Sequence, residues 1–190
     1  MSARNIAVLV GSLRHGSLSR KFADALPELA PDGLKFDIVE IGDLPLYNQD
    51  LDEGAPPEAW TRFRDQLRGA DGVIFITPEF NRGLPAALKN AIDVGSRPYG
   101  ASVFAGKPAA VISQSPGALG GFGANHQLRQ SLVFLDMPIV QQPEAYLSRS
   151  HEAFDDEGKI VSEPVRELLA DLLKRYAKLV DVRAPLRAAA

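Results

Sequence analysis

Short apolar runs alternate with amphipathic stretches along nearly the whole chain. The runs have the length of β-strands, and most are too continuously apolar for a strand with one face in water. They lie at residues 5–10, 36–41, 72–77, 109–113 and 139–141, the second being of mixed character and the fifth short. Together they predict five strands, the strongest of which are buried on both faces of a parallel sheet.

Helical periodicity fills the segments between these runs. Leu18, Phe22, Leu26 and Leu29 recur at the spacing of one helix face, and similar faces follow at residues 84–92, 128–135 and 165–179. A further helix is expected over residues 57–68. Strands that alternate with helices in this way predict an α/β fold with helices on both faces of a doubly wound parallel sheet. For five strands we expect the flavodoxin-like order 2-1-3-4-5 in a single domain over residues 1–182, with residues 183–190 as a loose tail.

Composition narrows the class of protein further. The chain has 190 residues, no cysteine and a net charge of −3. Disulfide scaffolds, thiolate zinc sites and cysteine nucleophiles are thereby excluded, and a broad basic surface for nucleic acid is not expected. The three histidines do not have metal-ligand spacing. No apolar run has the length of a membrane span or a signal peptide, so we expect a cytoplasmic protein that is not in a membrane.

The segment after the first strand has the composition of an anion-binding loop. It reads Gly-Ser-Leu-Arg-His-Gly-Ser-Leu-Ser-Arg over residues 11–20 and leads into the first helix, whose free N–H groups favour negative charge. Ser12, Ser17 and Ser19 can donate hydroxyl hydrogen bonds, and Arg14 can form a charge-assisted pair. A Walker loop is excluded because no Lys follows Gly16, and a dinucleotide fingerprint needs three glycines. The loop suits a terminal monophosphate; the alternative is that Ser17 only caps the helix.

Two further loops should meet this one at the carboxyl edge of the sheet. Residues 78–85 follow the third strand and contain Pro78, Gly83 and Pro85, which indicate an irregular turn before the next helix. Residues 113–121 follow the fourth strand and are rich in serine and glycine. Ligands of such sheets bind beyond the carboxyl ends of the strands, next to strand one. A phosphate alone binds too weakly, so the turn is expected to hold a flat heterocycle as well.

Residues 11–19, 78–93 and 117–129 together resemble the NADPH-dependent FMN reductases, a flavodoxin-like family that includes bacterial quinone and chromate reductases. The resemblance covers roughly residues 6–144, and its most specific part is Pro-Glu-aromatic-Asn followed by Leu-Lys-Asn-Ala-Ile-Asp. It implies that the first loop holds the FMN phosphate and that the other two line the isoalloxazine ring. The residues concerned are Ser12, Arg14, Ser17 and Ser19 for the phosphate, Pro78, Glu79, Phe80 and Asn81 for the ring, and Ser115 and Gly117 for its other edge.

The chain departs from the family pattern at three positions. Ser19 stands where Asn is frequent, Phe80 replaces the usual Tyr, and Val94 follows Asp93 where Trp is frequent. Arg82 is a candidate contact for the phosphates of NAD(P)H, with a solvated surface arginine as the alternative. Lys89 and Asn90 are interpreted as residues that brace neighbouring loops.

The sequence therefore predicts an FMN-dependent NAD(P)H oxidoreductase that passes hydride to a quinone, a flavin or a similar small acceptor. No catalytic side chain is assigned, because the flavin carries the chemistry. A flavodoxin-like electron carrier is the alternative. A hydrolase is disfavoured, because Ser113 occupies the first glycine position of a nucleophile elbow. The resemblance also implies a homodimer or homotetramer. The sequence leaves open NADPH against NADH, and whether residues 44–57 contact a neighbouring subunit or shape the mouth of the site.

Overall fold

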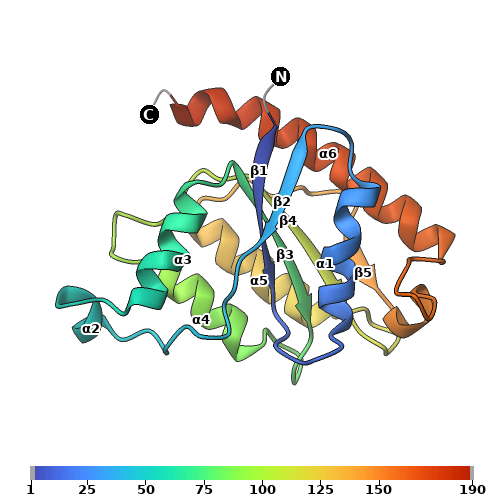
Figure 1. The fold of residues 1–190 in the computed structure, drawn as a ribbon, viewed down its shortest axis with the longest axis horizontal. Coiled ribbons are helices and arrows are strands. Elements are labelled where there is room, and N and C mark those ends of the chain that lie inside the picture. Colours follow the sequence, from blue (N-terminus) through green and yellow to red (C-terminus); the bar gives the residue numbers. More distant parts are fainter. Residues whose placement is uncertain (1–2, 189–190) are drawn as a thin grey trace.

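Five parallel strands form one sheet in the order β2-β1-β3-β4-β5 in the computed structural model, which describes residues 3–188 (Figure 1). The strands are β1 (Arg4–Val10), β2 (Leu34–Ile38), β3 (Gly72–Pro78), β4 (Ala109–Gln114) and β5 (Ala145–Leu147). The helices are α1 (Leu18–Leu29), α2 (Gln49–Glu53), α3 (Glu58–Arg68), α4 (Ala86–Gly95), α5 (Phe122–Phe134) and α6 (Glu163–Ala188), with a 3₁₀ turn at Ser150–Ala153. The predicted fold class and strand order are confirmed.

Helices cover both faces of the sheet, and each face has its own apolar core. α1 and α6 pack on one face through residues such as Phe22, Leu26 and Tyr176, and α3, α4 and α5 pack on the other (Figure 1). β3 and β4 lie between the two layers and are buried along almost their whole length. Each fully buried Leu or Phe side chain contributes about 1.5–3 kcal/mol, so these central strands form a rigid base for the loops that follow them.

Two strands differ from their predicted positions. The prediction of the fifth strand at residues 139–141 is wrong: Ile139 forms only an isolated bridge with Ala109 at the start of β4, and β5 lies at Ala145–Leu147. Pro143 lies between residues 139–141 and β5, and because proline has no N–H to donate to a strand ladder, pairing does not continue through it. β2 ends at Ile38, although Val39 and Ile41 beyond it are buried among α3 and α4. The N–H of Val39 still donates to the carbonyl of Val8 in β1 at 3.0 Å, and Ile41 is apolar because it is buried, without belonging to the strand.

The last helix occupies the carboxyl end of the described chain. α6 continues to Ala188, through most of the segment for which the sequence favours a loose tail, and residues 189–190 lie outside the described residues. Its buried positions, from Leu169 to Val180, pack against β4, β5 and α1. Within residues 3–188, no helix combines the length and the apolar character that crossing a membrane requires.

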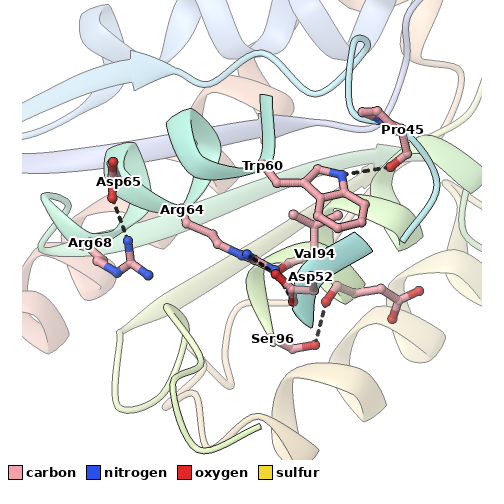
Figure 2. Close-up of polar contacts among 9 residues, drawn as sticks. Pro45, Asp52, Trp60, Arg64, Asp65, Arg68, Val94 and Ser96 are labelled. Atoms are coloured by element: carbon pink, nitrogen blue, oxygen red, sulfur yellow. Dashed lines mark hydrogen bonds and ion pairs between the residues drawn. The ribbon is translucent and has the colours of Figure 1, made fainter. Parts of the chain in front are cut away.

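A buried ion pair fastens residues 44–53, here called the α2 segment, to α3 and α4. Arg64 donates two hydrogen bonds to Asp52, at 2.7 and 2.8 Å, and a third to the carbonyl of Val94 at 3.0 Å (Figure 2). Both charged side chains are about 5% exposed. The Trp60 indole donates to the Pro45 carbonyl at 3.0 Å. The α2 segment is therefore held rigidly, because separating a buried pair would leave an uncompensated charge.

Asn90 on α4 provides a second attachment for the same segment. Its amide nitrogen donates to the carbonyls of Leu44 and Pro45 at 3.1 and 3.0 Å, and its oxygen accepts from the backbone N–H of Tyr47 at 2.8 Å. The interpretation of Asn90 as a residue that braces a neighbouring loop is confirmed. Lys89, the other residue interpreted in this way, instead forms an exposed ion pair with Asp93 on its own helix.

Candidate functional site

Three loops leave the carboxyl edge of the sheet side by side. The N–H of Gly11, just after β1, donates to the carbonyl of Ile76 in β3 at 2.8 Å, and Pro78 at the end of β3 is paired with Gln114 at the end of β4. The β1–α1, β3–α4 and β4–α5 loops therefore start at one level, on the edge opposite the N-terminus (Figure 1). This is the edge at which the sequence analysis places the site.

The β1–α1 loop combines exposed polar side chains with the start of a helix. Arg14 is exposed and Ser12 partly so. Ser17 is buried and accepts a hydrogen bond from the N–H of Arg20 at 3.2 Å, so it is the N-cap of α1. That bond uses one lone pair of the hydroxyl and leaves its proton available for a ligand. Capping and ligand binding are thus compatible at Ser17.

Ser19 belongs to a buried chain of polar groups that sequence reasoning missed. Its hydroxyl is completely buried and accepts from the side-chain amide of Gln114 at 2.9 Å, and Gln114 in turn accepts from the Ser150 hydroxyl at 2.6 Å. The chain ties the start of α1 to the end of β4. The signal in the sequence was the pair of polar residues Ser113 and Gln114 at the end of an apolar run, because a buried amide needs polar partners.

The β3–α4 loop contains a tight turn with an unusual backbone. Phe80 and Gly83 exchange two backbone hydrogen bonds, at 2.9 and 2.8 Å, and the residues between them, Asn81 and Arg82, have φ angles of 50° and 65°. Two successive positive φ angles define a type I′ turn. Asn tolerates this conformation, but for Arg it costs about 1 kcal/mol or more. A strained turn of this kind persists only where its surroundings fix it.

A cavity of about 610 Å³ lies between these two loops. One wall is apolar and comes from the β3–α4 loop and α4, and the other carries Ser12 and Arg14. The residues that line it are Gly11, Ser12, Leu13, Arg14, Pro78, Phe80, Asn81, Leu84, Pro85, Ala86 and Ala87. An apolar wall opposite a serine and an arginine, on a loop that leads into the N-terminus of α1, fits a planar heterocycle that carries a phosphate, as FMN does.

Gly11 lies where the two loops approach each other closely. A Cβ atom at this position would lie 3.1 Å from the Leu88 side chain and 3.2 Å from the Thr77 hydroxyl. The loop therefore starts directly against the end of β3. A larger hollow, of about 710 Å³, lies along β2 and the first half of β1, and neither the β3–α4 loop nor residues 11–14 line it. The residues that line the smaller cavity, and its position between two loops at the carboxyl edge, favour it as the ligand site.

The β4–α5 loop lies next to the cavity without lining it. The Ser115 hydroxyl accepts from the N–H of Gly117 at 3.1 Å, so it stabilises its own loop. The Gly117 carbonyl accepts from the N–H of Arg149. At the start of α5, the Phe122 ring packs against His126 and Tyr146. Burial, and to a smaller extent Glu144, raises the pKa of Tyr146 to about 12, so its hydroxyl stays neutral.

The predicted site residues thus divide into two groups. Ser12, Arg14, Pro78, Phe80 and Asn81 line one cavity. The other five do not line it: Ser17 caps α1, Ser19 belongs to the buried chain, Ser115 bonds within its own loop, Glu79 accepts from Ala124 of α5, and the Gly117 carbonyl accepts from Arg149. Among residues 3–188, no group of three or more His, Asp or Glu side chains is placed to hold a metal ion.

Comparisons with known proteins agree with this geometry. The family model described as NADPH-dependent FMN reductase matches residues 4–152. A quinone reductase of Pseudomonas putida is 60% identical over 178 residues, which cover 94% of this chain and 95% of that protein. A 2-hydroxy-1,4-benzoquinone reductase of Burkholderia sp. is 46% identical over 181 residues, with 95% and 98% of the two chains covered.

A solved structure gives the same result at the level of the fold. The flavoenzyme FerB, an NAD(P)H:(acceptor) oxidoreductase from Paracoccus denitrificans, superposes with a TM-score of 0.88 at 39% identity, and the match covers 95% of this chain and 99% of that one. The family match, the relatives and the fold agree with the chemistry of the cavity. The chain belongs to the NADPH-dependent FMN reductase family, with FMN as its cofactor and NAD(P)H as its co-substrate.

Proposed function

We propose that this protein is an FMN-dependent quinone reductase: NAD(P)H reduces bound FMN, and a quinone or a free flavin then takes the electrons. The observation that carries this function is the cavity at the carboxyl edge of the sheet, with its apolar wall on one side and Ser12 and Arg14 of the β1–α1 loop on the other. FMN, when bound, supplies the hydride chemistry, so the protein has to bind it, orient it and leave one ring face open.

The phosphate is proposed to bind at the β1–α1 loop. Arg14 and the Ser12 hydroxyl face the cavity, and the N–H groups of the first turn of α1 point toward the same loop. Ser17 would donate its remaining proton while it caps the helix. Ser19 is buried against Gln114, so we assign it a supporting role in fixing the start of α1.

The ring is proposed to lie against the β3–α4 turn. Pro78 and Phe80 would contact it through apolar surface, and Asn81 would place polar groups at its edge. Ser115 and Gly117, on the neighbouring loop, would bound its other edge. Arg82 projects from the tip of the turn with a side chain that is 73% exposed, where it could meet the phosphates of an incoming nicotinamide nucleotide.

The first test is an absorption spectrum of the purified protein before and after anaerobic addition of NADPH. We expect flavin bands that bleach with NADPH and return when 1,4-benzoquinone is added. Steady-state rates should then give the parallel double-reciprocal lines of a ping-pong reaction. A protein that neither contains nor binds FMN would refute the function. Bound flavin that neither NADPH nor NADH can reduce would indicate an electron carrier.

We further propose that the protein assembles as a homodimer or homotetramer through α4 and α5. Val133 and Phe134 on α5 are 70% and 79% exposed, beside a hollow of about 420 Å³ between the two helices. Exposed apolar residues next to a groove are typical of subunit contacts. Phe134→Glu should shift the molar mass measured by light scattering toward the monomer. A cytoplasmic location, where NAD(P)H is supplied, is part of this proposal.

A further inference from the structure

The carboxylate of Glu79, in the β3–α4 loop, points toward the first turn of helix α5. Glu79 follows β3 directly, and its side chain is only 13% exposed. Its Oε2 accepts a hydrogen bond from the backbone N–H of Ala124, in the first turn of α5, at 3.2 Å. α5 begins after Gly121, which has no side chain that could cap it. The cap of α5 is therefore supplied by a carboxylate 45 positions earlier in the chain, which also complements the helix dipole.

A second side chain joins the other end of the same turn to α5. The Oε1 atom of Gln127 accepts from the backbone N–H of Leu84 at 2.6 Å. Glu79 and Leu84 flank the type I′ turn, with Asn81 and Arg82 between them in left-handed conformations. Both ends of the strained turn are thus hydrogen-bonded to the first two turns of α5.

The middle of the turn also touches α5 directly. A Cβ atom at Gly123 would lie 2.6 Å from the carbonyl oxygen of Arg82 and 2.9 Å from the Glu79 carboxylate. Only glycine permits this approach of two backbones. The ion pair of Arg82 with Glu79 is long, at 3.4 Å, and the arginine is exposed, so it adds little to the attachment.

We propose that Glu79 and Gln127 are positioning residues for the flavin. Their side-chain oxygens hold the β3–α4 turn in the strained shape that lines the ring, and they make this turn and the start of α5 one rigid unit. The proposal rests on the proposed function in one respect, namely that the ring lies against this turn. A left-handed backbone at non-glycine residues relaxes when its surroundings no longer fix it, so loss of either oxygen should disorder the ring-binding surface.

The test compares Glu79→Ala and Gln127→Ala with the conservative variant Glu79→Gln. FMN affinity is measured by quenching of FMN fluorescence, and kcat with NADPH and 1,4-benzoquinone is measured at saturating FMN. We expect each alanine variant to weaken FMN binding about tenfold and to lower kcat about fivefold. Glu79→Gln, whose amide oxygen can still accept from Ala124, should stay within about threefold of the wild type. Glu167→Ala on α6 and Gln66→Ala on α3, both exposed in the native chain, are the matched controls.

Three outcomes would overturn the positioning role. If Glu79→Ala lowers the melting temperature while FMN affinity and kcat stay within twofold of the wild type, Glu79 is only a helix cap. If Glu79→Gln is as impaired as Glu79→Ala, the charge and not the hydrogen bond matters. Should Glu79→Ala fail to fold, the exposed Gln127 provides the same test, and unchanged FMN affinity in Gln127→Ala would refute the proposal. A wild-type protein that binds no FMN would instead refute the proposed function.

Discussion

The α2 segment and the cavity at the carboxyl edge each depend on an arginine, Arg64 of α3 for the first and Arg14 of the β1–α1 loop for the second, but the two arginines are used in opposite ways. Arg64 is buried, and its guanidinium is satisfied by Asp52 and by the Val94 carbonyl (Figure 2). Arg14 is exposed and lines the cavity. In the first arrangement every guanidinium nitrogen already donates to the protein and the group is buried, whereas the second leaves the guanidinium accessible to a ligand. Polar residues mark a site only where the protein itself does not satisfy them.

The two regions also differ in what fixes their backbone. The α2 segment is held by side chains that lie behind it on α3 and α4, so its own conformation carries no function that the structure reveals. The turn at Phe80–Gly83 is held from α5 while its other side faces the cavity. Mutations in the α2 segment should therefore change stability, and mutations at the cavity should change FMN binding.

The largest effect is expected from breaking the buried ion pair. Arg64→Ala leaves Asp52 buried without its partner, which typically costs about 3–5 kcal/mol. Such a loss should lower the melting temperature by roughly 10 °C in a chain of this size. Urea unfolding of the apo protein checks it. Arg68→Ala, one turn further along α3, is the control, because its pair with Asp65 is exposed and should change stability by less than about 1 kcal/mol (Figure 2).

The comparison would fail if Arg64→Ala weakened FMN binding as strongly as it destabilised the fold. In that case the α2 segment would shape the mouth of the site. We expect the FMN dissociation constant of Arg64→Ala to stay within about twofold of the wild type at a temperature where the variant is folded, because the α2 segment does not line the cavity.

The stability that the Arg64–Asp52 pair contributes should also decrease, by a smaller amount, at acidic pH. The hydrogen bonds from Arg64 lower the pKa of Asp52 below its ordinary value of 3.8. The folded protein thus binds this proton less readily than the unfolded chain. The stabilisation is therefore complete above about pH 5 and is lost as the pH falls through the folded-state pKa. The stability difference between wild type and Asp52→Asn, from urea unfolding at pH 7, 5 and 3.5, should be constant above pH 5 and shrink below it. A difference that grows in acid would contradict this assignment.

Arg14→Ala should have its effect on the cofactor alone. A charge-assisted hydrogen bond to phosphate contributes about 1.5–3 kcal/mol, so FMN affinity should fall roughly tenfold to hundredfold. The unfolding free energy of the apo protein should stay within about 0.5 kcal/mol, because Arg14 is exposed. Calorimetric titration with FMN measures the first quantity and urea unfolding the second. Arg175→Ala on α6, in an exposed ion pair, is the control, and equal FMN affinity in both variants would place the phosphate elsewhere.

The contrast between these regions also shows what the sequence could reveal. Apolar runs and helical periodicity predicted the alternation of strands and helices, and the general rules of α/β folds then predicted the strand order. In a parallel sheet of that order, the three loops lie at one edge. The resemblance named the ligand. These features depend on local patterns and on general rules of α/β folds.

Side-chain partners that are distant in sequence could not be predicted in this way. The side chains of Ser19 and Gln114 are 95 positions apart, and Glu79 reaches Ala124 across 45. Nothing in the local pattern distinguishes a glutamate that caps a remote helix from one that faces a ligand. The fifth strand was misplaced for a related reason: Ile139 and Val140 are buried without belonging to a strand, and only the pairing of Ala145 with Ile112 reveals the strand.

The smallest effect is expected at Phe80, which belongs to the cavity but is 65% exposed. If its ring packs against the flavin or the incoming quinone, Phe80→Ala removes an aromatic contact that contributes about 0.5–1.5 kcal/mol. The KM for 1,4-benzoquinone should then rise roughly twofold to tenfold, with apo stability unchanged. Phe80→Tyr keeps the ring and should behave as the wild type. An unchanged KM in Phe80→Ala, with Phe80→Tyr also unchanged, would show that the ring faces solvent and that Pro78 and the turn backbone alone form this wall of the cavity.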